Sequence, residues 1–272
     1  MIATQVLEED LGLKAPSFAY AKPRTLAEAF ELLARPDAKI LAGGQSLIPA
    51  LNMRLSAPEL LVDITALAEL RGILIDQDVV RIGALTTHAE IERSADVRKH
   101  LPVLSEAVAH LAHPAIRNRG TFGGSVALAD PAAEYPACLV ALDATIVLRS
   151  AAGERMVRAE DFFKGLFEVD LRSGELVAAA EIPALLKDEA SVFMELARRQ
   201  GDYAIVGLAG VRTQNERRLA FFGIGAKPVL LRPKSLDEAK NRIPAPAADL
   251  YHSSSTKLHL AKVLLERAWN RL

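Results

Sequence analysis

The sequence predicts an α+β protein divided into two parts. Short helix and strand patterns alternate through the first 185 residues, whereas three strand patterns follow one another between residues 192 and 224. The length of 272 residues agrees with this division, because one domain takes roughly 150 residues. We therefore expect a larger N-terminal domain over residues 1–185, a boundary near residues 185–190 and a smaller C-terminal domain over residues 186–272.

The elements of the N-terminal part follow from helix caps and apolar spacing. Thr25 and Glu28 have the spacing of a capping box, which predicts a helix with an apolar face of Leu26, Ala29, Phe30 and Leu33. Thr87 and Glu90 repeat this signal, and a later apolar stripe predicts a helix that stops before Pro114. Strands are expected over residues 39–42, 60–63, 79–84, 145–149 and 175–182, with a hairpin turn at Gly153.

The pattern of the C-terminal part predicts three strands backed by helices. The strands are expected over residues 192–198, 205–213 and 217–224, with the polar residues 214–216 as a hairpin loop. Ser235 and Glu238 predict the start of a short helix, and residues 244–246 predict a linker. The last helix is predicted by an apolar stripe of Leu258, Ala261, Leu265, Ala268, Trp269 and Leu272.

The balance of charge excludes several kinds of partner. The net charge is −1, from 33 basic and 34 acidic residues spread along the chain, so neither a nucleic-acid face nor a membrane-surface face is expected. Residues 1–10 carry three acids and no apolar core, unlike a secretion signal. No apolar run approaches the ~18 residues that span a membrane. These features predict a cytoplasmic protein.

Cysteine and histidine usage argues against a metal site in this chain. Cys138 is the only cysteine, whereas an iron–sulfur cluster takes about four thiolates, and a Cys-rich zinc site is excluded for the same reason. His110 and His113 have no third ligand nearby and are expected at helix ends. The apolar run around Cys138 predicts a core thiol rather than a nucleophile. Redox chemistry here would therefore need an organic cofactor.

A first candidate binding segment covers residues 40–47, where a strand pattern runs into two glycines and a polar pair. Gly43 and Gly44 have no Cβ, so their backbone N–H groups can turn toward one point and form a nest for a phosphate. A tight turn after a strand is the alternative interpretation. The candidate residues are Leu41, Ala42, Gly43, Gly44, Gln45, Ser46 and Leu47.

A second candidate segment covers residues 118–134 and holds another glycine pair between two hydroxyl side chains. Two such pairs could grip the two anionic groups of a pyrophosphate from opposite sides. Asp130 and Glu134 could bind sugar or ribityl hydroxyls, as acidic residues do in other nucleotide sites. A turn-starting aspartate and a solvated glutamate are the alternatives. The candidate residues are Thr121, Gly123, Gly124, Ser125, Asp130 and Glu134.

A third candidate segment covers residues 198–204, between two strands of the C-terminal part. Tyr203 could stack on a planar ring system and offer its hydroxyl to a polar edge of that ring. The alternative is a surface turn with a half-buried aromatic side chain.

Several common motifs are missing. No Gly-x-Gly-x-x-Gly pattern follows a strand and opens a helix, and Pro228 argues against a helix after the nearest candidate, residues 223–228. The Walker pattern and the Gly-x-Ser-x-Gly elbow of serine hydrolases are also absent. The sequence thus supports neither a Rossmann site nor a serine hydrolase.

Taken together, these segments resemble the FAD-binding medium subunits of the carbon monoxide dehydrogenase and xanthine dehydrogenase family. The resemblance runs from about Phe18 to the C-terminus. Its most specific feature is the spacing of the two glycine pairs. The motifs that carry it are residues 42–47, 82–88, 116–125, Asp130-Pro131 with Glu134, and residues 199–204.

The resemblance implies a fold and a cofactor. The fold would be the FAD-binding type shared with vanillyl-alcohol oxidase, with subdomains of about residues 1–65 and 66–185, followed by a domain with a three-stranded antiparallel sheet and helices. Segments 40–47 and 121–125 would surround the FAD pyrophosphate. Asp130 and Glu134 would contact FAD, and Tyr203 would lie beside the isoalloxazine ring.

The resemblance also implies partners. A large subunit with a molybdenum–molybdopterin cofactor would hydroxylate the substrate, and a small subunit with [2Fe-2S] clusters would relay single electrons. The flavin of this chain would collect them and reduce an external acceptor. No residue of this chain would act as catalytic acid or base, and the assembly would be a dimer of heterotrimers.

Two other functions are weighed against this one. A self-sufficient flavin oxidoreductase of the same fold would need its own substrate pocket, for which the length leaves little room, and no covalent-flavin histidine motif is present. A non-catalytic nucleotide-binding or assembly module would use the glycine segments only as turns.

Overall fold

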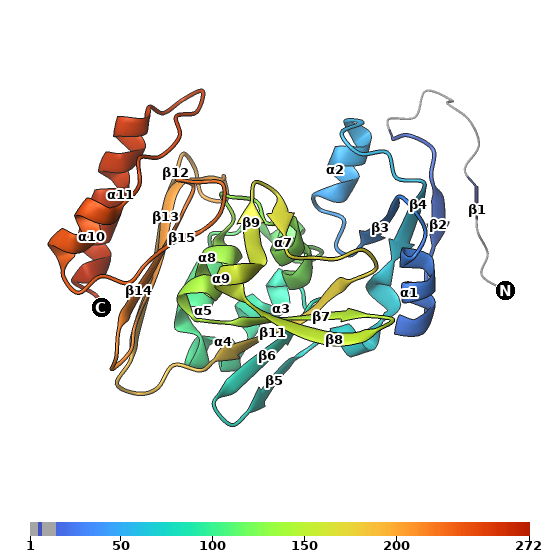
Figure 1. The fold of residues 1–272 in the computed structure, drawn as a ribbon, viewed down its shortest axis with the longest axis horizontal. Helices are drawn as coiled ribbons and strands as arrows, with labels where there is room; N and C mark the ends of the chain where they lie inside the picture. The colour runs from blue at the N-terminus through green and yellow to red at the C-terminus, as the bar shows by residue number, and fades with distance from the viewer. Residues whose placement is uncertain (1–4, 7–14) are drawn as a thin grey trace.

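The computed structural model describes residues 5–6 and 15–272, and the strands of these residues form three larger sheets and one two-stranded ribbon. Figure 1 shows a small sheet at one end, a five-stranded sheet with most helices in the middle, and the C-terminal sheet at the other end. Of residues 1–10, for which no secretion signal was expected, the structure describes only residues 5–6. No helix in the described ranges is long and apolar enough to cross a membrane.

The first sheet combines parallel strands with two helices. Its order is β1 (Gln5–Val6), β2 (Ala19–Ala21), β4 (Leu60–Asp63) and β3 (Ala38–Leu41), with β4 parallel to both β2 and β3. All four residues of β4 are buried, and α1 (Leu26–Leu33) covers the sheet with its apolar stripe. Helix α2 (Leu47–Asn52) follows β3, and two 3₁₀ turns (Ile64–Ala66 and Ala68–Leu70) lead into the second sheet.

The second sheet is antiparallel and carries most of the helices. Its order is β5 (Ile73–Asp76), β6 (Val79–Gly83), β11 (Leu176–Pro183), β7 (Thr145–Ser150) and β8 (Gly153–Arg158). A ribbon of β9 (Phe163–Gly165) and β10 (Glu168–Val169) lies beside it. The helices are α3 (His88–Arg93), α4 (Ala95–His100), α5 (Pro102–Val108), α6 (Pro114–Arg117), α7 (Phe122–Leu128), α8 (Glu134–Ala141) and α9 (Ala159–Phe162).

The C-terminal sheet has four strands in the described chain, not the three expected. The order is β12 (Ala190–Ala197), β13 (Ala204–Arg212), β14 (Arg217–Phe222) and β15 (Val229–Leu231), all antiparallel. The additional strand β15 is short and follows Pro228, so the turn signals before it conceal its pattern. Helices α10 (Leu236–Arg242) and α11 (Ser254–Trp269) complete this part.

The C-terminal sheet lies between two layers of helices. Side chains alternate along a strand, so Val192 of β12 faces α11 while Phe193 faces the other way. On that second face, Phe193 stacks on Phe222 with ring centroids 5.7 Å apart, in a core that also contains the apolar side of α8. The two parts of the chain therefore share one buried core.

Local sequence signals set most element boundaries. Thr87 and Glu90 form the complete capping box at the start of α3. Thr25 caps α1 as expected, but Glu28 accepts from the N–H of Arg24 instead of closing the box. The helix expected to stop before Pro114 ends earlier, at Val108, and Pro114 begins the separate helix α6, because proline fits the first turn of a helix.

Candidate functional site

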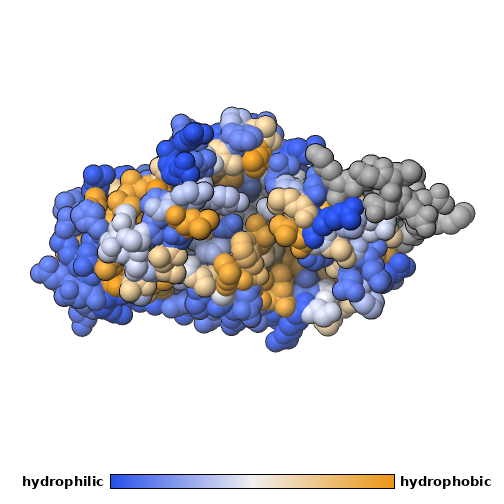
Figure 2. Space-filling view, turned by 90° about the horizontal axis from the view of Figure 1, so that it is seen from above, coloured by the Kyte–Doolittle hydropathy of each residue, from blue (hydrophilic) through white to orange (hydrophobic). Residues whose placement is uncertain are grey.

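A cavity of about 860 Å³ collects the candidate segments from distant parts of the chain. Its volume lies within the range of roughly 300–1,000 Å³ that is usual for small-molecule and cofactor sites. Figure 2 shows a hollow on this face, with hydrophobic surface gathered around its centre. The predicted residues that line the cavity are Ala42, Gly43, Gly44, Gln45, Ser46, Leu47, Thr121, Gly123, Gly124, Ser125, Asp130, Glu134 and Tyr203.

The loop between β3 and α2, residues 43–47, presents unused donors to this cavity; we name it the glycine loop. In the described part of the chain the backbone N–H groups of these five residues make no hydrogen bond. Gly44 adopts φ +72°, in the left-handed region that favours glycine. Successive free N–H groups at such a bend can bind an anion such as a phosphate.

The glycine loop lies directly against the segment that precedes α7. A Cβ atom on Gly43 would lie 2.4 Å from the carbonyl oxygen of Arg119 and 2.8 Å from Cα of Gly120. Only a glycine permits this approach, so Gly43 is what allows the two motif segments to form one wall of the cavity.

The second glycine pair has a different role from the one expected. The N–H of Gly123 donates to the carbonyl oxygen of Ala84 at 2.8 Å, and the N–H of Gly124 donates to Oγ1 of Thr121 at 3.2 Å. The expectation that both pairs present free N–H groups is therefore wrong for Gly123 and Gly124. A Cβ on Gly123 would lie 2.4 Å from Cβ of Ala84, so this glycine allows α7 to pack closely on the β6–α3 connection.

The two acidic candidates lie in the cavity wall beyond α7. Asp130 accepts from the N–H of Ala132 at 2.8 Å, so it does start a turn, as its alternative interpretation held. Burial raises the pKa of Asp130 above its ordinary value. Glu134 is 7% exposed, so the interpretation as a solvated charge is wrong. Burial also raises the pKa of Glu134, to about 7.

Tyr203 reaches the cavity from the C-terminal part. Its side chain lines the cavity yet stays largely exposed, so one ring face is open to a ligand or a partner. Gly201 holds the preceding turn at φ +82°, and a Cβ there would lie 2.5 Å from the carbonyl oxygen of Ala112. The turn is thus fixed against the α5–α6 connection.

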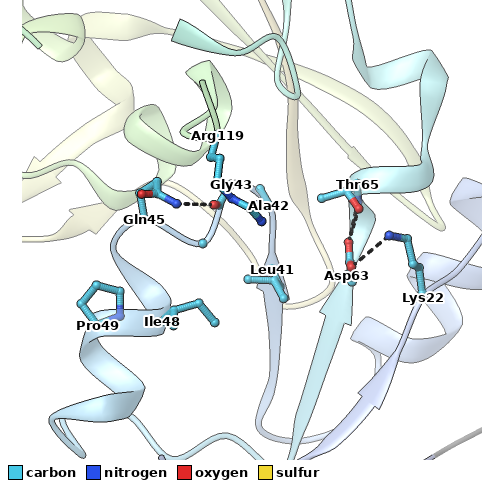
Figure 3. Close-up of a pocket in the computed structure, with 11 residues that line it drawn as sticks. Lys22, Leu41, Ala42, Gly43, Gln45, Ile48, Pro49, Asp63, Thr65 and Arg119 are labelled. Atoms are coloured by element: carbon cyan, nitrogen blue, oxygen red, sulfur yellow. Dashed lines mark hydrogen bonds and ion pairs between the residues drawn. The ribbon is translucent and has the colours of Figure 1, made fainter. Parts of the chain in front are cut away.

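A smaller hollow of about 490 Å³ adjoins the glycine loop and contains Leu41, the one candidate outside the larger cavity (Figure 3). Two cationic side chains, Lys22 and Arg119, line it. Lys22 pairs with Asp63 at 3.2 Å. Burial works to raise the pKa of Asp63, but hydrogen bonds from Thr65 and Tyr20 outweigh it and keep this pKa below its usual range. The ionised Asp63 thus balances the charge of Lys22, and Arg119 is the further cation of this hollow.

Among the lining residues that the sequence did not predict, His88 and Phe167 stand out by their chemistry. His88, 4% exposed, lines the cavity, and its Nδ1 has no partner among the described residues. Burial lowers the pKa of His88 to about 4. Phe167, at the tip of the β9–β10 ribbon, lines the mouth with φ +54°, an unusual conformation for an aromatic residue. In the sequence, Phe167 lies two residues after Gly165 with no recognisable motif, and His88 lies within a helix capping box, so neither residue signalled a binding site.

Neither histidines nor acids form a metal centre in the part of the chain that the structure describes, where no group of three His, Cys, Asp or Glu residues is placed to hold an ion. Cys138 is a buried free thiol in the core, as expected.

Comparison with known proteins identifies the family. Residues 16–185 match the family described as the FAD binding domain in molybdopterin dehydrogenase. The chain belongs to this family. It is 45% identical over 207 residues to the alpha subunit of the 6-hydroxypseudooxynicotine dehydrogenase complex of Paenarthrobacter nicotinovorans, which covers 75% of this chain and 70% of that subunit. It is 34% identical to the carbon monoxide dehydrogenase medium chain of Hydrogenophaga pseudoflava, over 94% of this chain and 96% of that one.

Solved structures agree with this family. A chain of the reconstituted CO dehydrogenase from Oligotropha carboxidovorans superposes with a TM-score of 0.89 at 32% identity, covering 94% of this chain and 98% of that chain. A chain of quinoline 2-oxidoreductase from Pseudomonas putida 86 gives a TM-score of 0.87 at 36% identity, covering 93% and 96%. The resemblance to medium subunits with FAD as cofactor is confirmed, as are the mixed helix-and-sheet fold and the assignment to oxidoreductases.

Proposed function

We propose that this chain is the FAD-carrying subunit of a heterotrimeric molybdenum hydroxylase, and that FAD binds in the 860 Å³ cavity. The observation that carries the proposal is the glycine loop, which lines this cavity and whose free N–H groups suit a pyrophosphate. The FAD-binding domain would cover residues 1–185 in a vanillyl-alcohol-oxidase-type fold, with subdomains divided near residue 65, and residues 186–272 would form the C-terminal domain.

Different residues of the cavity bind different parts of this cofactor. The glycine loop binds the pyrophosphate through its N–H groups. Ser125, Asp130 and Glu134 offer polar atoms to the ribityl hydroxyls, and Tyr203 offers an aromatic face to the flavin ring. When bound, the flavin accepts electrons singly and donates one or two. The protein orients the ring, limits its contact with water and supplies no acid or base to a substrate.

The partners follow from the names of the relatives. One is the medium chain of carbon monoxide dehydrogenase, and others are subunits of caffeine dehydrogenase and of 6-hydroxypseudooxynicotine dehydrogenase. The substrates in these names differ widely although the chains are similar, so the substrate is set by another subunit. We assign substrate oxidation to a large molybdopterin-binding subunit and electron relay to a small [2Fe-2S] subunit, in a cytoplasmic dimer of heterotrimers that reduces an external acceptor.

Purification of the full chain tests the cofactor assignment. The protein should show flavin absorbance as isolated or after incubation with FAD, and the cofactor released on denaturation should be FAD rather than FMN. A colourless chain that takes up neither flavin would overturn the proposal.

Purification of the native assembly tests the partner assignment. Material isolated through a tag on this chain should contain two further subunits together with molybdenum and iron in metal analysis. Recovery of the flavin-loaded chain alone, with steady turnover of an organic substrate, would instead identify a self-sufficient flavin oxidoreductase.

A further inference from the structure

The imidazole of His88 has two ring nitrogens that make no hydrogen bond within the described chain. The side chain is 4% exposed and lines the 860 Å³ cavity. Its Nδ1 atom is enclosed by the described residues, whereas Nε2 keeps accessible surface. Buried polar side chains are nearly always paired, so an imidazole of this kind points to a ligand that the cavity receives.

The backbone around His88 fixes the place of this ring. Its N–H donates to the carbonyl oxygen of Gly120 at 3.0 Å, and Thr87 forms an antiparallel bridge with Thr121. The start of α3 is thereby joined to the residues that precede α7. The ring of Tyr135 packs against the imidazole, with 5.4 Å between the two centroids. His88 therefore has a defined place in the cavity wall.

Gly120 lies between this ring and the glycine loop. A Cβ on Gly120 would lie 2.6 Å from Nε2 of His88, and a Cβ on Gly43 would lie 2.8 Å from Cα of Gly120. Two Cα–Cβ bonds of about 1.5 Å complete this path, so Nε2 lies no more than about 8.5 Å from Cα of Gly43. A phosphate group with a hydrogen bond of about 2.9 Å on each side spans a similar distance.

The proton of the imidazole is assigned to Nε2. Burial and then the charge of Arg117 lower the pKa of His88 to about 4, so the ring is neutral near pH 7 and carries one proton. A proton on Nδ1 would leave an enclosed N–H without an acceptor, which is costly. A proton on Nε2 can instead be accepted by a ligand in the cavity. His88 thus offers a neutral donor at this point.

The neighbouring donors favour a ligand with several acceptor atoms. The five free N–H groups of the glycine loop belong to residues that line the same cavity as His88. Neither these groups nor Nε2 bind an acid of the described chain. A phosphate has several acceptor oxygens and a negative charge, so it can accept from the loop and from the imidazole at the same time.

We propose that the Nε2–H group of His88 donates a hydrogen bond to a phosphate oxygen of bound FAD, in addition to the N–H groups of the glycine loop. The inference rests on the proposed function, because it assigns a further contact to the same cofactor. His88 binds the cofactor in this role and transfers no proton to a substrate. Gly120 and Tyr135 hold its ring in place.

Ligands that contain only part of FAD test this contact in the flavin-free full chain. ADP carries the pyrophosphate without the flavin, and riboflavin carries the ring and the ribityl chain without a phosphate. His88→Phe keeps an aromatic ring but removes the donor. Its Kd for FAD and for ADP should rise about tenfold or more, because a hydrogen bond to a charged group is lost. Its Kd for riboflavin should stay at the wild-type value. Flavin fluorescence measures the two flavins, and titration calorimetry measures ADP.

Two further variants control for the change of side chain. His88→Gln is the conservative variant, because its amide N–H can take the place of the Nε2–H group, and it should restore most of the affinity for ADP. His259→Phe changes an exposed histidine that does not line the cavity, so it should keep all three wild-type Kd values.

A measurement on the unaltered chain decides the question if His88→Phe does not fold. In protein labelled with nitrogen-15 histidine, the NMR signals of His88 are identified by their absence from His88→Gln. Nε2 should be the protonated nitrogen, and its signal should shift when ADP binds. A protonated Nδ1, or an Nε2 signal that ADP does not move, would overturn the proposal.

The outcomes separate this inference from the proposed function. If FAD binds but His88→Phe keeps the wild-type Kd for ADP, the phosphate contact is rejected while the FAD assignment stands. The same holds if His88→Phe weakens riboflavin binding as much as FAD binding, because the contact would then be to the flavin half. If the wild-type chain binds no FAD, the proposed function itself is rejected.

Discussion

The two glycine pairs of this chain look alike in sequence but have different roles. The glycine loop, residues 43–47, leaves five N–H groups without partners in the described chain and lines the cavity. Gly123 and Gly124 instead use their N–H groups on Ala84 and Thr121, inside what we name the packed segment, residues 118–125. A glycine pair thus predicts close backbone approach, and only the surrounding structure decides whether the neighbour is a ligand or the protein itself.

The largest effect is expected in the packed segment. Gly123→Ala places a Cβ 2.4 Å from Cβ of Ala84 in a buried contact, so the free energy of unfolding should fall by about 3 kcal/mol. Denaturant unfolding of the flavin-free chain measures this change. Gly124→Ala is the matched control, because its Cβ meets only Oγ1 of Thr121, at 2.8 Å, and it should cost far less. Equal losses at both positions would contradict the packing role.

The second effect concerns acid stability next to the packed segment. A Cβ on Gly120 would lie 2.6 Å from Nε2 of His88, so the ring packs directly against this glycine. Burial lowers the pKa of His88 from 6.5 to about 4. Between pH 6.5 and 4 the imidazole of His88 is protonated in the unfolded chain but neutral in the folded chain. The free energy of unfolding should therefore fall as the pH is lowered through this range, by up to roughly 3 kcal/mol.

Stability measured against pH for His88→Gln should show a shallower loss over that window than the wild-type chain. The exposed His259 provides the control, since His259→Gln should leave the slope unchanged. An unchanged slope in His88→Gln would mean that the ring is protonated in the folded chain.

The third effect separates strain from binding in the glycine loop. Gly44 and Gly174 have similar conformations, with φ +72° and +76°, and Gly174 has open space around it. Alanine at either position should cost about 1–2 kcal/mol of stability through left-handed strain. Only Gly44→Ala should also weaken FAD binding, because relaxing the loop turns its N–H groups. FAD titration of the two variants makes the comparison, and equal Kd values would reject the nest.

The smallest effect is expected at Tyr203. Tyr203→Ala should weaken FAD binding about three- to tenfold, since ring stacking contributes roughly 0.5–1.5 kcal/mol. Its stability should change little, because the side chain is 73% exposed. Tyr251 is equally exposed and does not line the cavity, so Tyr251→Ala should bind FAD as the wild-type chain does. Equal Kd values for the two variants would remove Tyr203 from the site.

Local signals in the sequence predicted much of the fold. Strand β4 begins and ends at the expected residues, Leu60 and Asp63, since an apolar run closed by a capping aspartate has one natural boundary. Helix α7 was not foreseen, because its first turn contains two glycines, which are poor helix formers. Packing on the β6–α3 connection stabilises it instead, and such long-range contacts leave no local pattern.

The residues that the sequence named line the cavity, except Leu41, but the sequence did not show how buried each side chain is or how each N–H group is used. Gly43 and Gly44 could be recognised because a pair of glycines indicates that another group lies close to the backbone. The exposure of Tyr203 and the burial of Glu134 could not be read from their neighbours in sequence.

The stacked rings of Phe193 and Phe222 have a consequence for the thermal unfolding of this chain. They bury the α8 side of the C-terminal sheet in the same core as the helices of the preceding domain. A chain truncated after residue 185 would expose the apolar surface of α8 and its neighbouring helices to water and should aggregate. Calorimetry of the intact chain should accordingly show a single cooperative transition.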